Sequence, residues 1–247
     1  MNKAFYRNKV FFSSILIGCL ILFNLSCGLD TIYIIEPPKN IVNTPSYNST
    51  DDSFDYFAFY TNETENGNSE IIFLGTDVYY KIYRNTSKLD SECSNILSLV
   101  SKDDNSSANS MQNTYNFQPL RVKNRNDDIL IPRNTKDQRV FIRLSDLNLQ
   151  DDSDDTDKSN VIVTLNDNNI FSEEPIRNLP YISTFNFKAG ENDNTPKDGD
   201  VDTSYTGQGI DSEWYVAMFA VSVGRDASYV KLFSNVAYLG SVKILVK

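Results

Sequence analysis

The feature that most constrains the fold is an apolar stretch near the end of the chain, Trp214–Val223 (WYVAMFAVSV). Side chains alternate between the two faces of a strand, and both alternating sets are apolar here. A strand that is apolar on both faces is predicted to be a central strand of its sheet. Gly224–Asp226 predicts a turn after it, and Tyr229–Phe233 and Val236–Val246 predict an antiparallel return.

Other strand signals precede this stretch. Val78–Arg84 follows Gly75 and alternates at period two, so that Tyr79, Lys81 and Tyr83 share one face. The remaining segments are short and rich in β-branched or aromatic residues. These further strands are predicted at Phe54–Thr61, Ile71–Leu74, Leu120–Val122, Val140–Leu144, Val161–Leu165 and Tyr181–Phe187.

A single helix is predicted in the middle of the chain. Ser87–Asp90 matches a capping box in its Asp form, which marks a helix start. Four residues then follow at helical spacing and define a buried face: Leu89, Cys93, Ile96 and Val100. Polar segments elsewhere predict loops at Asn62–Asn68, Ser101–Thr114 and Gly190–Gly209.

The order of these elements suggests a sandwich. An aromatic strand, a tyrosine-rich strand after a glycine and two long C-terminal strands resemble the fibronectin type III or immunoglobulin-like domain, with two facing antiparallel sheets. Such domains have about 100 residues, so the resemblance implies a large insertion at about residues 86–212 that carries the short helix. The paired cysteines and mid-domain tryptophan of true immunoglobulin domains are missing. Another antiparallel β architecture is the alternative.

The first 28 residues have the layout of a bacterial lipoprotein signal. Lys3, Arg7 and Lys9 form a basic start, Val10–Phe23 is apolar, and Cys27 follows shortly after it. The apolar run has about 14 residues, whereas a membrane-spanning helix needs about 20. We therefore expect cleavage before Cys27 and a covalent lipid on its thiol, a diacylglycerol with acyl chains such as palmitate.

Cys19 is the alternative lipidation site. Leu16–Gly18 matches the usual motif before the modified cysteine better than Asn24–Ser26 does. Cleavage there would shorten the apolar run and leave Leu20–Phe23 at the start of the mature chain, so Cys27 is preferred. Each buried acyl CH₂ contributes about 0.8 kcal/mol, so several chains hold a soluble domain at a membrane. An ordinary secretory signal with a chance cysteine is a further alternative.

The predicted domain organisation has three parts. Residues 1–27 are the signal peptide, residues 28–53 are a flexible tether rich in Pro, Asn and Ser, and residues 54–247 are a single sandwich domain. No internal repeat divides that domain into two copies.

Two stretches resemble spirochaete lipoproteins of unknown function. The first is Cys27–Tyr33 followed by Ile35–Pro38, and the second is Gly75–Tyr83. The resemblance implies a loosened signal motif, in which Asn24 is acceptable. It implies no catalytic residues for this chain.

Composition excludes several classes of function. Without the signal, the chain has 20 basic and 33 acidic residues, a formal charge of −13. Nucleic-acid binding needs Lys and Arg to neutralise phosphates, so it is not expected. Anionic lipid would repel this charge, so the anchor is expected to hold the protein on the membrane. The chain has no histidine, which removes Ser-His and Cys-His catalytic sites and histidine zinc sites.

Candidate site residues are few. Asp151–Asp157 and the run that contains Asp198, Asp200 and Asp202 offer the oxygen ligands that Ca²⁺ prefers, but the former lacks the EF-hand Gly and Glu, and the latter favours a turn. Metal binding is therefore only a weak hypothesis. Cys93 is expected to be a small core residue rather than a reactive thiol.

Tyr79 and Tyr83 are the candidates for recognition of a partner, since tyrosine combines an apolar ring with a polar tip. The alternative is that their strand face packs against the insertion.

The functional expectation is a lipid-anchored, non-catalytic envelope protein that binds an unidentified protein or glycan and uses no cofactor besides its covalent lipid. Gly28, rather than Asp, follows the lipidated cysteine, which favours the outer over the inner membrane. A structural envelope component without a soluble ligand is one alternative. A carbohydrate-active enzyme is another, and it needs two carboxylates that converge in a cleft.

Overall fold

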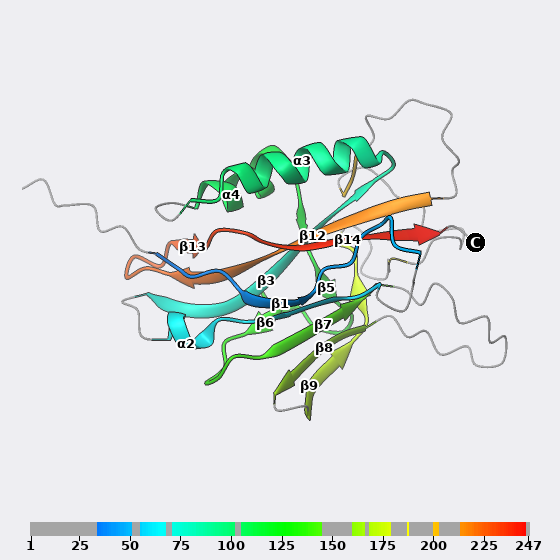
Figure 1. Cartoon of the computed structure of the whole chain (residues 1–247). Helices are drawn as coiled ribbons and strands as arrows, with labels where there is room; N and C mark the ends of the chain where they lie inside the picture. Colours follow the sequence, from blue (N-terminus) through cyan, green and yellow to red (C-terminus); the bar gives the residue numbers. More distant parts are fainter. Residues whose placement is uncertain are drawn as a thin grey trace, which may run out of the picture. The chain divides into compact units, whose positions relative to one another are not determined.

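The centre of the fold is an antiparallel pair of long strands, β3 (Ile72–Tyr83) and β12 (Glu213–Arg225) (Figure 1). The register places Tyr215 opposite Tyr83 and Arg225 opposite Ile72. The computed structural model describes residues 34–50, 55–67, 71–101, 105–144, 160–165, 168–178, 187, 200–202 and 213–245. The predicted position of Trp214–Val223 as a central strand is confirmed.

Shorter strands extend this sheet on both sides. β13 (Lys231–Phe233) and β14 (Ala237–Leu245) pair with the outer edge of β12. Three two-residue segments share the outer edge of β3 in turn: β6 (Ile131–Pro132), β4 (Gln118–Pro119) and β11 (Val201–Asp202). The β11–β3 pair is parallel, whereas the other pairs in this sheet are antiparallel.

A second, five-stranded antiparallel sheet faces the first. Its order is β1 (Lys39–Asn43), β2 (Phe57–Tyr60), β7 (Arg139–Arg143), β8 (Asn160–Leu165) and β9 (Asn168–Glu173). A separate pair joins β5 (Arg121–Val122) to β10 (Pro175–Ile176). Alternating inward side chains of both sheets form one core, which includes Phe57, Phe59, Val140, Ile142, Val161 and Val163 from the second sheet and Val78, Tyr80, Ile82, Val216, Met218 and Ala220 from the first.

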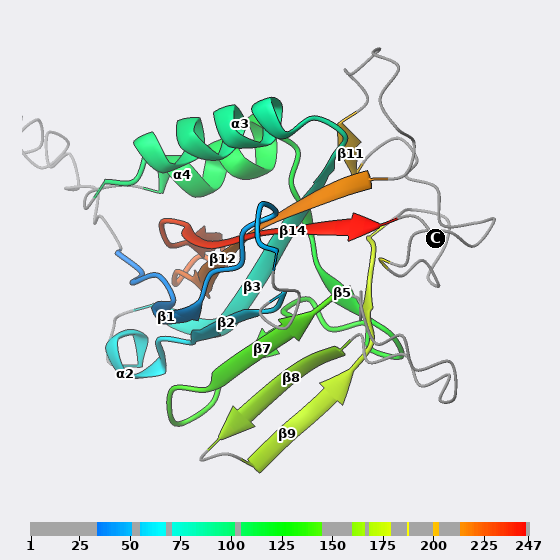
Figure 2. The ribbon, with the colours of Figure 1, turned by 45° about the vertical axis from the view of Figure 1, so that its right-hand side comes forward.

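Helices cover the opposite face of the first sheet (Figure 2). They are α3 (Thr86–Ser98), α4 (Ser106–Asn109) and the π-helical turn η2 (Ser110–Thr114). Leu89, Cys93, Ile96, Ala108 and Met111 pack there against Tyr79, Tyr83, Phe219 and Val221. The molecule is therefore mainly β with three layers, helices on a sheet on a sheet, because β3 and β12 are apolar on both faces.

The predicted helix is confirmed, with different ends. It begins at Thr86 because the side chain of Asn85 caps it, accepting a hydrogen bond from the N–H of Lys88 at 3.1 Å. The predicted capping residue Ser87 therefore lies inside the helix. The helix ends at Ser98, and Val100 beyond it is 46% exposed instead of buried.

Segments predicted as loops contain regular structure. α2 (Glu63–Asn66) lies within Asn62–Asn68, α4 and η2 lie within Ser101–Thr114, and β11 lies within Gly190–Gly209. The loop predictions are wrong at these places because tertiary contacts outweigh weak local propensity. The predicted strand at residues 181–186 lies outside the described residues.

The predicted insertion, residues 86–212, is not an appendage. It supplies β7, β8 and β9 of the second sheet, all of α3 and α4, and the segments along the outer edge of β3. Val140, Ile142, Val161 and Val163 of this segment lie in the core that the two sheets share. The described part of residues 86–212 therefore contributes directly to the core.

The predicted tether also differs from the structure over residues 34–50. Ile35 is 5% exposed, β1 pairs with β2, and the N–H of Ser241 donates to the carbonyl of Pro45 at 2.9 Å. This stretch is held by sheet pairing and by packing, so it belongs to the fold. No helix in the described ranges is long and apolar enough to cross a bilayer.

Gly240 tests how firmly this N-terminal stretch belongs to the fold. Its φ is +114°, and an added Cβ would lie 2.5 Å from the carbonyl oxygen of Pro45. We expect Gly240→Ala to lower the free energy of unfolding by about 2 kcal/mol or more, because strain and the close approach add. Urea denaturation measures this, with exposed Ser94→Ala as the control. Equal stability of the two variants would show that residues 34–50 lie loosely on the domain.

Candidate functional site

Several predicted site residues lie outside the described residues. These are both candidate lipidation sites, Cys27 and Cys19, together with Asp198 and the acidic run Asp151–Asp157. Their predictions stay untested by the geometry.

The structure gives Asp200 an internal partner. Its carboxylate receives two hydrogen bonds from Arg177, Nε to Oδ2 at 2.5 Å and Nη2 to Oδ1 at 2.6 Å, and both side chains are about 1% exposed or less. The hydroxyl of Tyr80 also donates to Oδ2 at 3.1 Å, and it accepts from the N–H of Asn178 at 2.8 Å. A two-pronged contact of this kind is the strong form of an ion pair.

Asp202 is engaged on the helix side of the sheet. Lys88 of α3 contacts both of its carboxylate oxygens at 2.9 Å. Lys88 also lies 3.7 Å from Glu92, whose Oε2 accepts from Lys81 at 2.7 Å and from the hydroxyl of Tyr83 at 2.9 Å. This network ties α3 to β3 and β11 through charges that are mostly buried.

These contacts do not support the weak metal hypothesis for Asp200 and Asp202. Each carboxylate is already neutralised by a cationic side chain, Arg177 or Lys88. Across the described part of the chain, no group of three or more acidic, Cys or His side chains is placed to hold a metal ion.

The tyrosine candidates are buried. Tyr79 is 5% exposed and Tyr83 is 0% exposed, and both pack under the helix layer. Burial raises the pKa of both hydroxyls above the ordinary value. Recognition of a partner by their rings is therefore not supported, and the alternative, packing against the inserted segment, is confirmed.

Cys93 is a core residue, as predicted. It is 5% exposed, and burial raises the pKa of its thiol to about 12. The thiolate is the nucleophilic form, so this thiol is unreactive at neutral pH.

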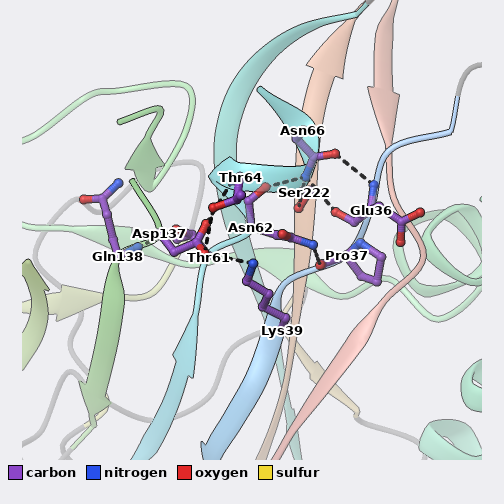
Figure 3. A network of polar contacts seen from close by, with 10 residues as sticks. All are labelled: Glu36, Pro37, Lys39, Thr61, Asn62, Thr64, Asn66, Asp137, Gln138 and Ser222. Atoms are coloured by element: carbon purple, nitrogen blue, oxygen red, sulfur yellow. Dashed lines mark hydrogen bonds and ion pairs between the residues drawn. The ribbon is translucent and has the colours of Figure 1, made fainter. Parts of the chain in front are cut away.

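A polar cluster holds the first described residues of the chain in place (Figure 3). We call residues 34–38 the strap, because they lead into β1 along the ends of β3 and β12. The Asn66 side chain makes two hydrogen bonds to the backbone of Glu36: it accepts from the N–H at 2.9 Å and donates to the carbonyl at 2.9 Å. Asn62 donates to the carbonyl of Pro37 at 3.0 Å. Two amide side chains of one short helical turn thus grip the strap.

A second set of contacts fixes α2 itself. Asp137 accepts from the N–H and the hydroxyl of Thr64, each at 3.0 Å, and pairs with Lys39 at 2.8 Å. Burial raises the pKa of Asp137, but the hydrogen bonds from Lys39 and Thr64 outweigh it, so its pKa is lowered overall. Thr61 and Gln138 exchange hydrogen bonds at 2.8 and 2.9 Å.

We call Asn62 and Asn66, the two side chains that hold the strap, the clamp. Glu63 lies beside the clamp, and its carboxylate has no good partner among the described residues. It is 4% exposed, and neither carboxylate oxygen reaches a donor with hydrogen-bond geometry. The backbone of Asn134 and the side chain of Gln138 lie close enough to favour the charged form, yet burial is the larger effect and raises the pKa of Glu63 to about 7.

A small hollow lies next to the β5 strand. It is lined by Arg121, Val122, Arg125, Asp127, Ile129 and Leu130. Its volume of about 10 Å³ is enough for a single water molecule. Asp77 lies near it but is 1% exposed, accepts from the N–H of Leu130 at 2.9 Å and is 3.7 Å from Arg121.

Comparison with family models, curated proteins and solved structures gives no match to this chain. The description of the site therefore depends on its own geometry. Sequence reasoning missed the clamp because Asn62–Asn68 is polar and predicts a loop. The available signal was Asn62 and Asn66, two amides four residues apart on one helical face.

The buried pair of Arg177 and Asp200 gives a stability prediction. We expect Asp200→Asn to lower the free energy of unfolding by about 3–5 kcal/mol, because it leaves the Arg177 charge buried and uncompensated. Urea denaturation measures the change. The control is Glu174→Gln, which breaks the more exposed 2.8 Å pair with Lys123 and should cost about 1 kcal/mol or less. Equal losses in the two variants would contradict the role of burial.

Glu63 gives a pH prediction. Its folded-state pKa of about 7 lies above the ordinary 4.5, so the neutral carboxyl contributes stability below pH 4.5 that is lost as the pH rises through 7. Relative to Glu63→Gln, the wild type should lose about 2 kcal/mol between pH 4.5 and pH 8. Denaturation at several pH values measures the difference, and Glu65→Gln on the exposed side of α2 should leave the profile unchanged. A Glu63→Gln profile parallel to that of the wild type would refute the assignment.

Proposed function

We propose that this chain is a bacterial lipoprotein, anchored through lipid on Cys27, that carries a non-catalytic interaction module for an envelope or host protein or glycan. The observation that carries the proposal is the signal layout of residues 1–28. The position of the strap supports it, since Ile34, the first described residue, comes only seven residues after Cys27.

The clamp gives this proposal a structural basis. A protein lipidated at Cys27 is held on the membrane through the chain that follows this residue. The strap must therefore keep a fixed position on the domain. Asn62 and Asn66 bind the backbone of Glu36 and Pro37 rather than their side chains. These hydrogen bonds hold the strap in one position on the domain.

The contacts of the acidic side chains and of the cysteine support the non-catalytic part of the proposal. Asp200 and Asp202 are held in ion pairs, Asp77 is buried next to an arginine, and the thiol of Cys93 is not available at neutral pH. A structural envelope role and a carbohydrate-active enzyme remain the alternative predictions. The enzyme would need converging carboxylates in a cleft.

The finer fold type also stays a prediction. Two facing sheets with alternating inward side chains support a fibronectin type III or immunoglobulin-like sandwich. The helix layer and the parallel β11–β3 pair are departures from that type.

Lipidation is tested by metabolic labelling with a palmitate analogue. We expect Cys27→Ser to lose the label and to move the protein from the membrane to the soluble fraction. Cys19→Ser is the matched control and should keep both the label and the membrane location. Loss of label in Cys19→Ser alone would reassign the anchor to Cys19, and unlabelled wild type would overturn the lipoprotein proposal.

The membrane and its face are tested separately. Fractionation of cells carrying the wild type should place the protein in the outer membrane. Protease treatment of intact cells then separates an outward-facing domain, which is digested, from a periplasmic one, which is protected until the outer membrane is permeabilised.

A further inference from the structure

Exposed apolar side chains gather near the first described residues of the chain. Ile34, the first described residue, is 53% exposed. The next residue, Ile35, packs over Gly224 of β12, where an added Cβ would lie 2.9 Å from its Cδ1 and 2.7 Å from Cγ2 of Ile71. This start of the strap therefore lies against the end of β12 and the start of β3.

The turn between β12 and β13 projects from the same end of the sheet. Tyr229 is 74% exposed and Val230 is 55% exposed, the two highest values among the large hydrophobic residues of the described chain. Ile72, 44% exposed, pairs directly with Arg225, which in turn pairs with Lys231 across the turn. We call Ile34, Ile72, Arg225, Tyr229, Val230 and Lys231 the hairpin face.

Tyr229 stands in an unfavourable backbone conformation. Its φ is +64°, a region that suits Gly or Asn and disfavours bulky residues. The ring buries little area in return, and its main contact is the guanidinium of Arg225, 4.8 Å from its centroid. Strained residues of this kind cluster at functional positions, so an exposed aromatic here points to a contact outside the chain.

The charge of this face differs from that of the whole protein. Arg225 lies 4.8 Å from the exposed ring, and Lys231 pairs with Arg225 across the turn while its ammonium lies 6.0 Å from the ring of Phe233. Two cations thus lie at this turn in a chain whose overall charge is strongly negative. The carboxylate of Asp226 accepts from the N–H groups of Ser228 and Val230, each at 2.9 Å, so it is used within the turn. Among the described residues, Asp77 is close enough to Lys231 to be influenced by its charge but is buried, and Glu36 is exposed on the strap. Tyr with Lys and Arg is the composition that favours a membrane interface.

The length of the anchor segment limits which end can face the bilayer. From Cys27 to Ile34 the chain reaches at most about 25 Å, even when fully extended. A domain of this size has a radius of gyration of about 17 Å, so the segment is shorter than the domain is wide. The end that carries Ile34 therefore stays next to the membrane.

We propose that the hairpin face rests on the lipid bilayer as a second contact beside the lipid anchor. Tyr229 and Val230 enter the interface, while Arg225 and Lys231 contact lipid phosphates. The inference rests on the proposed anchor at Cys27. This contact also revises the expectation that anionic lipid repels the whole protein surface. The hairpin face carries Arg225 and Lys231, so this end does not belong to the repelled acidic surface.

Two exposed serines allow a matched test on the full lipidated protein in vesicles of phosphatidylcholine and phosphatidylglycerol. Ser228→Cys lies in the hairpin turn, and Ser87→Cys lies on α3 just beyond the far end of β3, a strand about 40 Å long. Each carries a polarity-sensitive fluorophore. Cys93 stays unlabelled because it is buried and its thiol pKa is about 12.

We expect the label at position 228, and not the label at position 87, to be quenched by brominated acyl chains. Quenching by aqueous iodide at position 228 should be lower by roughly twofold or more, since interfacial groups enter about 5–10 Å. Adding Tyr229→Asn, which suits the positive φ, should reverse both effects. Equal quenching at the two sites would overturn the inference, and unchanged quenching in Tyr229→Asn would overturn the role of the ring.

Failure of the anchor gives a different result. If the wild type does not float with vesicles, or floats equally after Cys27→Ser, the proposed lipidation is wrong. If flotation depends on Cys27 but the label at 228 stays in water, the anchor stands and only the hairpin-face contact is refuted.

Discussion

The structure depends on the antiparallel pairing of β3 with β12, two strands that carry apolar side chains on both faces. Such a pair cannot leave either face in water, so it requires two covering layers. The five-stranded sheet covers one face and the helices cover the other. This requirement explains why the segment between residues 86 and 212 is part of the core. It also explains why Tyr79 and Tyr83 became packing residues instead of a recognition surface.

The buried charged groups lie at the boundaries between these layers. At the far end of β3, Arg177 and Asp200 lie on the side of the sheet that carries Tyr80, while Lys88, Glu92 and Asp202 join the helix layer to the sheet. Burying an ion pair costs free energy, because both charges lose water. We therefore interpret these pairs as contacts that specify one arrangement of the helices and strands. Asp200 and Asp202, two of the residues that suggested a calcium site, thus provide internal partners for Arg177 and Lys88.

The N-terminal residues link the fold to the proposed anchor. The strap is gripped by Asn62 and Asn66 at the end of the sheet from which the β12–β13 turn projects. An anchor attached there holds one end of the molecule near the bilayer, and that end carries the exposed Tyr229. Under the proposed anchor, the opposite end, with the start of α3 and β11, would be the end directed away from the membrane.

The sequence by itself determined the strands with clear alternation, the helix through Leu89, Cys93 and Ile96, and the signal layout, because each depends on local periodicity or local composition. It did not predict α2, α4 or β11, whose polar residues become ordered only through partners far along the chain, such as Asp137 for Thr64 and Lys88 for Asp202. The sequence did not predict the clamp or the buried ion pairs either, because their partners are also far apart along the chain. Only the tertiary structure decided which carboxylates are neutralised and which tyrosines are buried, because burial and pairing depend on residues that meet across layers.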